Sequence, residues 1–156
     1  TLIAGHPYSS KWVSWPFMIR PIYYWTGSET DGASSKIYLI GNPIICWAST
    51  IAMVSILLGL FQGILKRNFR DKNGIFLAVA FLINLLPFIG IKRAMFLYHY
   101  MPALIFAILG LVYLIDQYEN KKKIFIVLIL LSAASFVFFS PLTYGLKLSN
   151  GAFNAR

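Results

Sequence analysis

Four apolar blocks, each long enough to cross a lipid bilayer, follow one another along this chain with short polar segments between them. They lie at about residues 43–65, 75–91, 93–115 and 124–139. The first block has about 23 residues, which span roughly 34 Å as a helix, and the hydrocarbon core of a bilayer is about 30 Å thick. Only 12% of the residues are charged, and 58% are hydrophobic, which excludes an ordinary water-soluble domain. The predicted fold class is therefore all-α integral membrane, with four transmembrane helices.

The third block has a length problem that fixes where its helix must begin. From Pro102 to the residue before Asp116 it contains only about 14 residues, roughly 21 Å, which is too short to cross. We therefore expect the helix to begin near Arg93, with Pro102 as a bend inside it. This start places residues 98–100 in the outer part of the membrane.

Two other blocks are irregular. The second contains Asn84 and Pro87, so we expect a kink there, and an amide that faces another helix or a wet cavity. The fourth, at 124–139, is short. It is either steeply placed or extended past Pro141 toward Tyr144.

The residues before the first block differ in composition from the rest. Residues 1–42 hold three of the four tryptophans, and Trp and Tyr prefer the headgroup level of a membrane. We predict an extracytoplasmic, interfacial aromatic segment, and the simpler alternative is an ordinary aromatic belt without chemistry. Within it, the Gly- and Ser-rich residues 27–36 predict a mobile loop. Residues 140–156 have no strong pattern and form an extracytoplasmic tail in this interpretation. The chain begins at Thr1 with no signal peptide, so we expect it to be part of a longer protein.

The positive charges predict the orientation in the membrane. The net charge is +9, but the basic residues lie in short clusters between apolar blocks, which argues against nucleic-acid binding. Seven of the fourteen are concentrated in the two short loops 66–73 and 116–123, which directly adjoin helix ends. By the positive-inside rule these loops are cytoplasmic, so both termini are predicted to lie outside.

Two segments on the predicted outer side could carry chemistry. They are HPYSSKWVSWPFMIRPIYYW, residues 6–25, and KRAMFLYHY, residues 92–100. Both combine cations, imidazole and aromatic rings. The candidate substrate- and lipid-phosphate-binding residues are His6, Tyr8, Trp15, Arg20, Lys92, Arg93, Tyr98, His99 and Tyr100.

Each candidate has a functional and a structural interpretation. Lys92 and Arg93 either extend to lipid headgroups as interfacial anchors or hold the phosphate of an anionic lipid. Arginine suits the second role, because its planar guanidinium makes two parallel bonds to phosphate oxygens. His99 either donates to the same phosphate or is a hydrogen-bonded structural histidine.

The chain offers no convincing catalytic acid or metal site. Its single cysteine, Cys46, lies inside an apolar block, and two histidines cannot assemble a metal cluster. Of the five acids, Glu29 and Asp31 lie in the Gly/Ser loop, whereas Asp116 and Glu119 are predicted to be solvated cytoplasmic charges. We assign no catalytic residue and no metal ligand.

The two candidate segments resemble those of one enzyme family. HPYSSKWVSWPFMIRPIYYW, followed by IYLIGNPIICW (residues 37–47) and KRAMFLYHYMPALIF (residues 92–106), is similar in order and spacing to the C-terminal four-span region of protein O-mannosyltransferases. The resemblance covers most of the chain. One family motif matches at His6, Tyr8, Trp15 and Pro16, and another at Arg93, Phe96, Tyr98, His99, Tyr100 and Pro102. The RPIYYW ending looks like the bacterial branch.

The resemblance implies a fold and an activity. It implies part of a GT-C-type enzyme that moves mannose from a polyprenyl or dolichyl phosphate to Ser/Thr hydroxyls of proteins. No cofactor is expected in this fragment beyond that lipid-linked sugar donor. The expected partners are the bilayer, the donor, the acceptor protein and the N-terminal membrane half, which carries the catalytic acid in that family. The bacterial branch places the protein in the bacterial cell membrane rather than in the endoplasmic reticulum.

Three other interpretations remain open. A non-catalytic membrane assembly subunit would use the aromatic segment as a docking surface. A transporter half would explain the broken second span, but the chain has no inverted repeat. A related transferase could move a different sugar from a lipid phosphate, because nothing in these residues identifies the sugar.

Overall fold

The computed structural model describes residues 6–27, 33–66 and 71–155. The membrane helices are α1 (Pro43–Leu65), α2 (Lys72–Leu85), α3 (Met101–Asp116) and α4 (Lys121–Tyr144). Short elements surround them. They are the strands β1 (Ile22–Thr26), β2 (Ala33–Ser34), β3 (Lys36–Leu39) and β4 (Leu148–Ser149), the helix α5 (Asn150–Asn154), and 3₁₀ helices at Trp12–Ser14, Leu86–Gly90 and Leu97–Tyr100.

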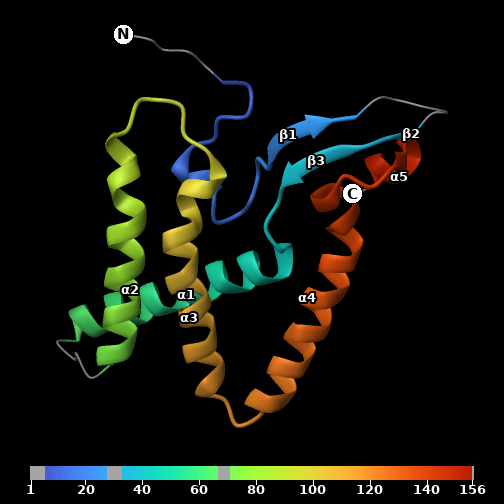
Figure 1. The fold of residues 1–156 in the computed structure, drawn as a ribbon. Coiled ribbons are helices and arrows are strands. Elements are labelled where there is room, and N and C mark those ends of the chain that lie inside the picture. The colour runs from blue at the N-terminus through green and yellow to red at the C-terminus, as the bar shows by residue number, and fades with distance from the viewer. Residues whose placement is uncertain (1–5, 28–32, 67–70, 156) are drawn as a thin grey trace.

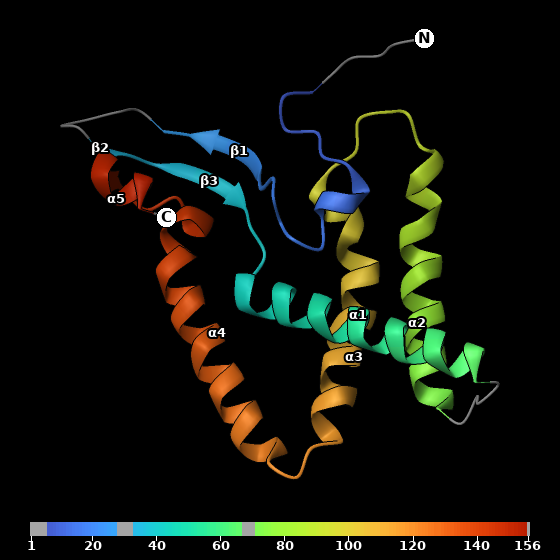
Figure 2. The ribbon, with the colours of Figure 1, turned by 180° about the vertical axis from the view of Figure 1, so that it is seen from behind.

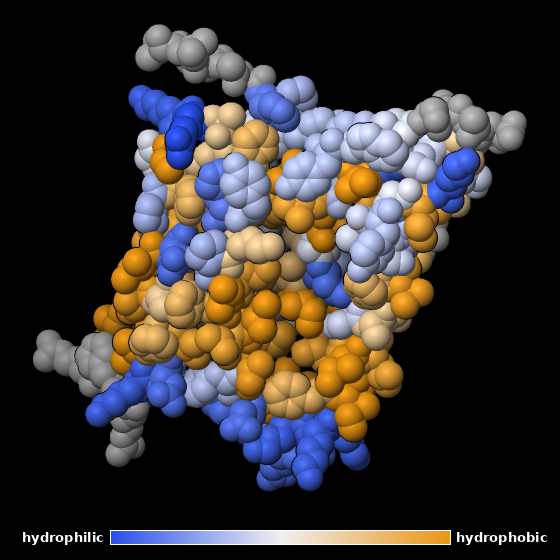
Figure 3. Space-filling model, in the orientation of Figure 1, coloured by the Kyte–Doolittle hydropathy of each residue, from blue (hydrophilic) through white to orange (hydrophobic). Residues whose placement is uncertain are grey.

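The predicted four spans are confirmed. Four helical stretches are long and apolar enough to cross a membrane: Pro43–Leu65, Lys72–Gly90, Leu97–Asp116 and Lys121–Tyr144. Figure 3 shows an apolar band between two hydrophilic ends of the molecule. The end of α1, the start of α2 and the connection between α3 and α4 lie at one end, and β1, β3 and α5 lie at the other (Figure 1). Residues 67–70 of the first basic loop are outside the described residues.

α3 is the central helix of the packing. Figures 1 and 2 show α1 running obliquely across α3 and α2, which stand side by side. Small residues of α3 let α1 approach closely. Ala103 and Ala107 are fully buried, and a Cβ added at Gly110 would lie 3.0 Å from the Met53 Cε atom. In α4, by contrast, only Leu142 is buried, so most of this helix faces lipid or another part of a larger protein.

The third span begins later than the sequence predicts. Phe96 is extended, a 3₁₀ turn covers Leu97–Tyr100, and the α-helix starts at Met101 instead of near Arg93. Pro102 therefore lies in the first turn, where its missing N–H costs little, and it does not bend the helix. The span does begin before Pro102, as the length argument requires, but only at Leu97. The helix continues through Asp116 and a 3₁₀ turn rises about 2 Å per residue, so Leu97–Asp116 already reaches roughly 32 Å without the residues from Arg93 to Phe96.

The second span changes its helix type where Pro87 occurs. The α-helix ends at Leu85, and a 3₁₀ helix continues through Gly90. The Asn84 side chain donates to the Ala80 carbonyl oxygen at 2.9 Å. One N–H of the amide thus finds its partner one turn back in its own helix.

The fourth span takes the longer of its two predicted forms. α4 runs through Pro141 to Tyr144 and ends at Gly145, whose φ of 66° is left-handed. Proline at 141 cannot donate to the Val137 carbonyl, and the Ser140 hydroxyl donates to that oxygen at 2.9 Å instead.

The all-α prediction included no strands, but the segment before α1 contains short ones. β1 and β3 form a two-stranded antiparallel sheet, and β2 pairs with β4 from the tail. The tail is tied to β3 through Phe153, which lies against Tyr38 and under the Lys36 ammonium group at 4.0 Å. Strands this short give no readable alternation in the sequence. Residues 28–32 of the predicted mobile loop, with Glu29 and Asp31, are outside the described residues.

Candidate functional site

Trp15 joins the two candidate segments. Its side chain is completely buried, and its Nε1 donates to the Ser10 hydroxyl at 2.9 Å. The indole is stacked near the His99 ring, with centroids 6.0 Å apart and planes 11° apart, and it meets Phe88 edge to face at 5.0 Å. The Ser10 backbone N–H also donates to the Met95 carbonyl oxygen at 2.8 Å. Residues 6–25 are thereby fixed on the connection between α2 and α3.

α1 holds the same segment from a second side. The Thr50 hydroxyl lies 2.9 Å from the Pro16 carbonyl oxygen, and the Trp47 Nε1 donates to the Phe17 carbonyl oxygen at 3.2 Å. Sequence reasoning did not identify Trp47 or Thr50 as supports. No local pattern could reveal them, because each contact joins residues more than 29 positions apart.

The His99 ring is held by the backbone of Phe96, at the start of the 3₁₀ turn that contains His99. Its Nδ1 lies 3.0 Å from the Phe96 carbonyl oxygen and 3.3 Å from the Phe96 backbone nitrogen. With Nδ1 engaged locally, Nε2 is the nitrogen that can reach a ligand. Tyr98 stacks on the His99 ring at 4.3 Å and is 47% exposed. These two side chains thus form a half-open aromatic surface.

Tyr100 differs from its neighbours Tyr98 and His99 in that its side chain is buried. It is 2% exposed and meets Phe81 edge to face at 6.4 Å, so it belongs to the core between α2 and α3. The family motif therefore combines two kinds of position: Tyr98 and His99 near the surface, and Tyr100 inside.

Aromatic rings continue outward from the site. His6 meets Phe96 edge to face at 5.0 Å, and Phe96 stacks on Tyr98 at 5.7 Å. A second row links Tyr8, Tyr23 and Tyr38 through centroid distances of 5.3 Å. Burial, with smaller contributions from Tyr8 and Tyr23, raises the pKa of Tyr38.

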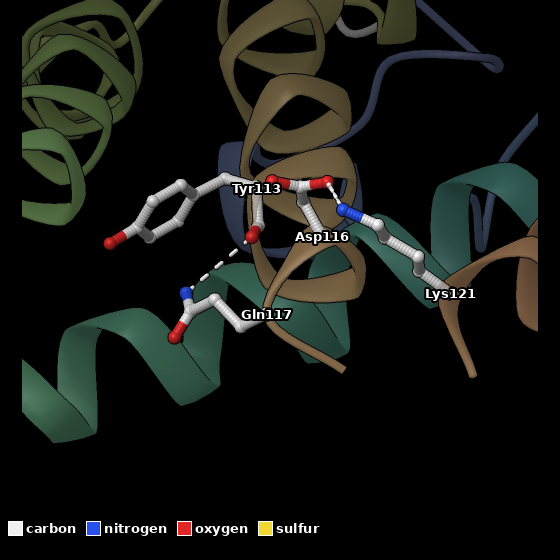
Figure 4. A network of polar contacts seen from close by, with 4 residues as sticks. All are labelled: Tyr113, Asp116, Gln117 and Lys121. Carbon is white, nitrogen blue, oxygen red and sulfur yellow. Dashed lines mark hydrogen bonds and ion pairs between the residues drawn. The ribbon is translucent and has the colours of Figure 1, made fainter. Parts of the chain in front are cut away.

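The cations at this end lack acidic partners within the described residues. Lys92, Arg93 and Arg20 are exposed, and Arg20 Nη1 donates to the Ser9 carbonyl oxygen at 3.1 Å. Among the described residues the ion pair is Lys121–Asp116, at the opposite end (Figure 4). The other described acids, Asp71 and Glu119, also lie in the α1–α2 and α3–α4 connections. Within the described residues, this end of the molecule therefore carries positive charge without a neighbouring acid, beside an aromatic surface.

A small apolar cavity lies beside this surface. Its volume is about 80 Å³, and it is lined by the outer segment, the start of α1 and the start of α3, including Met18, Gly41, Cys46, Tyr98 and Leu104. Polar and apolar groups therefore meet at the outer end, with the cations outermost and the cavity toward the membrane interior.

The fold defines a multi-pass membrane protein with cations and aromatic rings gathered at one end. The chain belongs to the family described as the C-terminal four TMM region of protein-O-mannosyltransferase, which matches residues 1–156. The predicted family is confirmed, and so is the predicted four-helix membrane region of a GT-C-type enzyme.

Individual relatives agree with this assignment. The chain is 33% identical to dolichyl-phosphate-mannose–protein mannosyltransferase 1 of Saccharomyces cerevisiae over 92% of its length, which is 20% of that protein. It is 31% identical to human protein O-mannosyl-transferase 1 over 91% of its length, which is 22% of that protein. Among solved structures, it is similar to the S. cerevisiae protein O-mannosyltransferase Pmt1-Pmt2 complex bound to the sugar donor. The TM-score is 0.70 at 31% identity, over 92% of this chain and 22% of the other. The chain thus spans about a fifth of the length of the relatives that it matches.

Proposed function

We propose that this chain forms the outer, carrier-lipid side of the cavity in an enzyme that transfers mannose from a polyprenyl or dolichyl phosphate to Ser/Thr hydroxyls of proteins. The observation that supports this most is the excess of cations, Lys92, Arg93 and Arg20, beside the Trp15–His99 surface, with the described acids at the other end. Such a cluster of cations at the membrane surface suits the phosphate of a lipid, because cationic side chains form charge-assisted hydrogen bonds to phosphate oxygens.

The roles of the residues follow from their positions. Arg93 and Lys92 would bind the phosphate oxygens, and His99 Nε2 would add a donor. Tyr98 and the small apolar cavity would contact the first part of the lipid chain. His6, Tyr8 and Trp15 would support this surface through their ring contacts, and the buried Tyr100 would pack behind it and line the cavity.

The proposal places the protein in a membrane with this end outside. The basic loops after α1 and α3 would be cytoplasmic, and the outer segment and α5 extracytoplasmic. Its partners would be the lipid-linked donor, the acceptor protein and the N-terminal membrane half. We propose the bacterial cell membrane as the location. The RPIYYW ending is the only support for this, because the relatives named above are eukaryotic.

Substitution of Arg93 in the intact enzyme tests the phosphate role. We expect Arg93→Ala to lower transfer from lipid-linked mannose about tenfold or more at limiting donor, because a charge-assisted bond to phosphate is worth roughly 1.5–3 kcal/mol. The measurement is transfer of labelled mannose to a Ser/Thr peptide at varied donor concentration.

Lys147→Ala is the matched control, because Lys147 is an exposed cation at the same end of the molecule. It should leave the KM for the donor unchanged. Unchanged activity of Arg93→Ala at limiting donor would refute the phosphate role. Transfer of a different sugar by the unsubstituted enzyme would leave the proposed phosphate site standing but would show that the donor does not carry mannose.

A further inference from the structure

The outer strand β1 has an unpaired edge next to the candidate site. β1 pairs on one side with β3, and within the described residues no strand lies on its other side. Figures 1 and 2 both show β1 as the outermost strand, with β3 between it and the top of α4. The far side of β3 is occupied by the tail, where Ile37 lies close to Gly145 and Tyr38 faces Phe153. β1 is therefore the strand that can accept another.

The side chains of β1 change from buried to exposed along its length. Ile22 is 5% exposed and packs in the same core cluster as Trp15. Tyr24 is 58% exposed and Trp25 is 50% exposed. The strand thus begins in the candidate site and leads away from it, and its outer half presents large aromatic side chains to the surroundings.

An irregularity limits how much chain this edge can pair with. The register with β3 shifts between Tyr23 and Trp25, so Tyr24 has no partner residue on β3. A bulge of this kind twists an edge and discourages long, permanent pairing. With only five residues, roughly 17 Å, β1 suits a short segment that binds and leaves.

We propose that β1 binds the extended acceptor polypeptide by strand addition, and this inference rests on the proposed function. The relatives are named as mannosyltransferases that act on proteins, so their substrate is a polypeptide chain. A strand edge reads backbone N–H and C=O groups and does not require particular side chains. Successive side chains of the added strand point to opposite faces of the sheet. A Ser or Thr at every second position of the acceptor would therefore place its hydroxyl on the face where Tyr8 stacks on Tyr23.

Backbone methylation of the acceptor tests this mode of binding directly. The experiment uses the intact enzyme in nanodiscs and fluorescent peptides with one Thr in an Ala background, each N-methylated at a single position. We expect the Kd from fluorescence anisotropy to rise tenfold or more at every second position and to stay within twofold at the positions between. Equal effects at both sets of positions, or no binding of the unmethylated peptide, would overturn the inference.

Crosslinking then locates the peptide. Tyr24→Cys should react with a bromoacetyl acceptor peptide well above the background of the unsubstituted enzyme. Tyr144→Cys is the control, because Tyr144 is similarly exposed, at 64%, but lies at the end of α4. Equal labelling at both positions would overturn the assignment to β1, as expected if only lipid headgroups cover this strand.

Mannose transfer is measured in the same samples, so the two proposals fail separately. Alternating Kd values and selective crosslinking without transfer would support strand addition and refute the proposed function. Transfer without alternation would refute strand addition and leave the proposed function standing.

Discussion

The single residue on which the site depends most is Trp15. It is completely buried, and its contacts with Ser10, Phe88 and His99 join three separate parts of the chain. A tryptophan at a membrane interface usually keeps its N–H in contact with water, but here the donor is satisfied inside the protein. Trp15 therefore acts as an anchor of the site and not as part of an aromatic belt.

We predict that Ser10→Ala destabilises the outer segment. The change leaves the Trp15 N–H buried without its acceptor, which costs about 1–3 kcal/mol. It should lower the midpoint of thermal unfolding in detergent and raise the donor KM, because His99 loses a fixed neighbour. Ser14→Ala is the control. The Ser14 hydroxyl bonds to the Lys11 carbonyl oxygen at an exposed position, so its loss should change the stability by less than about 0.5 kcal/mol. Equal effects of the two substitutions would contradict the anchoring role.

At the scale of elements, Asn42 connects α1 and α4 through hydrogen bonds of its side-chain amide. Its Oδ1 accepts from the backbone N–H groups of Ile44 and Ile45 at the start of α1, at 3.1 Å and 3.3 Å. Its Nδ2 donates to the Ser132 carbonyl oxygen of α4 at 2.8 Å. One amide thus caps α1 and holds α4 in place near mid-helix.

Asn42→Ala and Asn42→Ser should separate these two roles. Serine keeps a capping oxygen but cannot reach α4, whereas alanine loses both bonds, so we expect alanine to be less stable than serine by about 1 kcal/mol. Both variants lose the bond to α4, which should appear as faster backbone amide hydrogen exchange in the part of α4 around Ser132. Identical unfolding midpoints for the two variants would show that the cap contributes nothing.

The sequence predicted the elements far better than their ends. Apolar length is a property of each segment alone, so the four spans were readable. The start of the third span was not, because it depends on Phe96 being extended and on a 3₁₀ turn that only packing selects. The pairing of β1 with β3 and the return of Phe153 onto Tyr38 were also hidden, since both are long-range contacts of very short elements.

The candidate site was predicted in composition but not in geometry. The two segments were expected on one side, and the structure places Trp15 of one against His99 of the other. The inward position of Tyr100 and the support from Thr50 depend on the oblique packing of α1, which no local pattern encodes.

At the scale of the whole molecule, the charges predict how the chain is oriented. The three lysines 121–123 begin α4, where the positive end of the helix dipole makes cations unfavourable. Anionic headgroups of the cytoplasmic leaflet would offset that cost. We expect a membrane-impermeant maleimide to label Tyr144→Cys from outside intact cells and Lys122→Cys only after permeabilisation. The reverse pattern would invert the proposed topology and place the site in the cytoplasm.

The positions of the acids predict what the chain can do alone. Transfer of a sugar to a hydroxyl needs a base that takes the proton as the sugar–phosphate bond breaks. The described acids Asp71, Asp116 and Glu119 lie at the end opposite the site, and the Tyr113 hydroxyl donates to the Asp71 carboxylate at 2.5 Å, which ties Asp71 to α3. Glu29 and Asp31 lie outside the described residues, so the prediction rests on the described acids alone: the chain expressed by itself should insert into membranes but transfer no labelled mannose from the lipid donor. Co-expression with the N-terminal part of the enzyme as a separate polypeptide should restore transfer if, as we propose, that part supplies the base. Transfer by the chain alone, above that of membranes without it, would show that an acid within these 156 residues reaches the site.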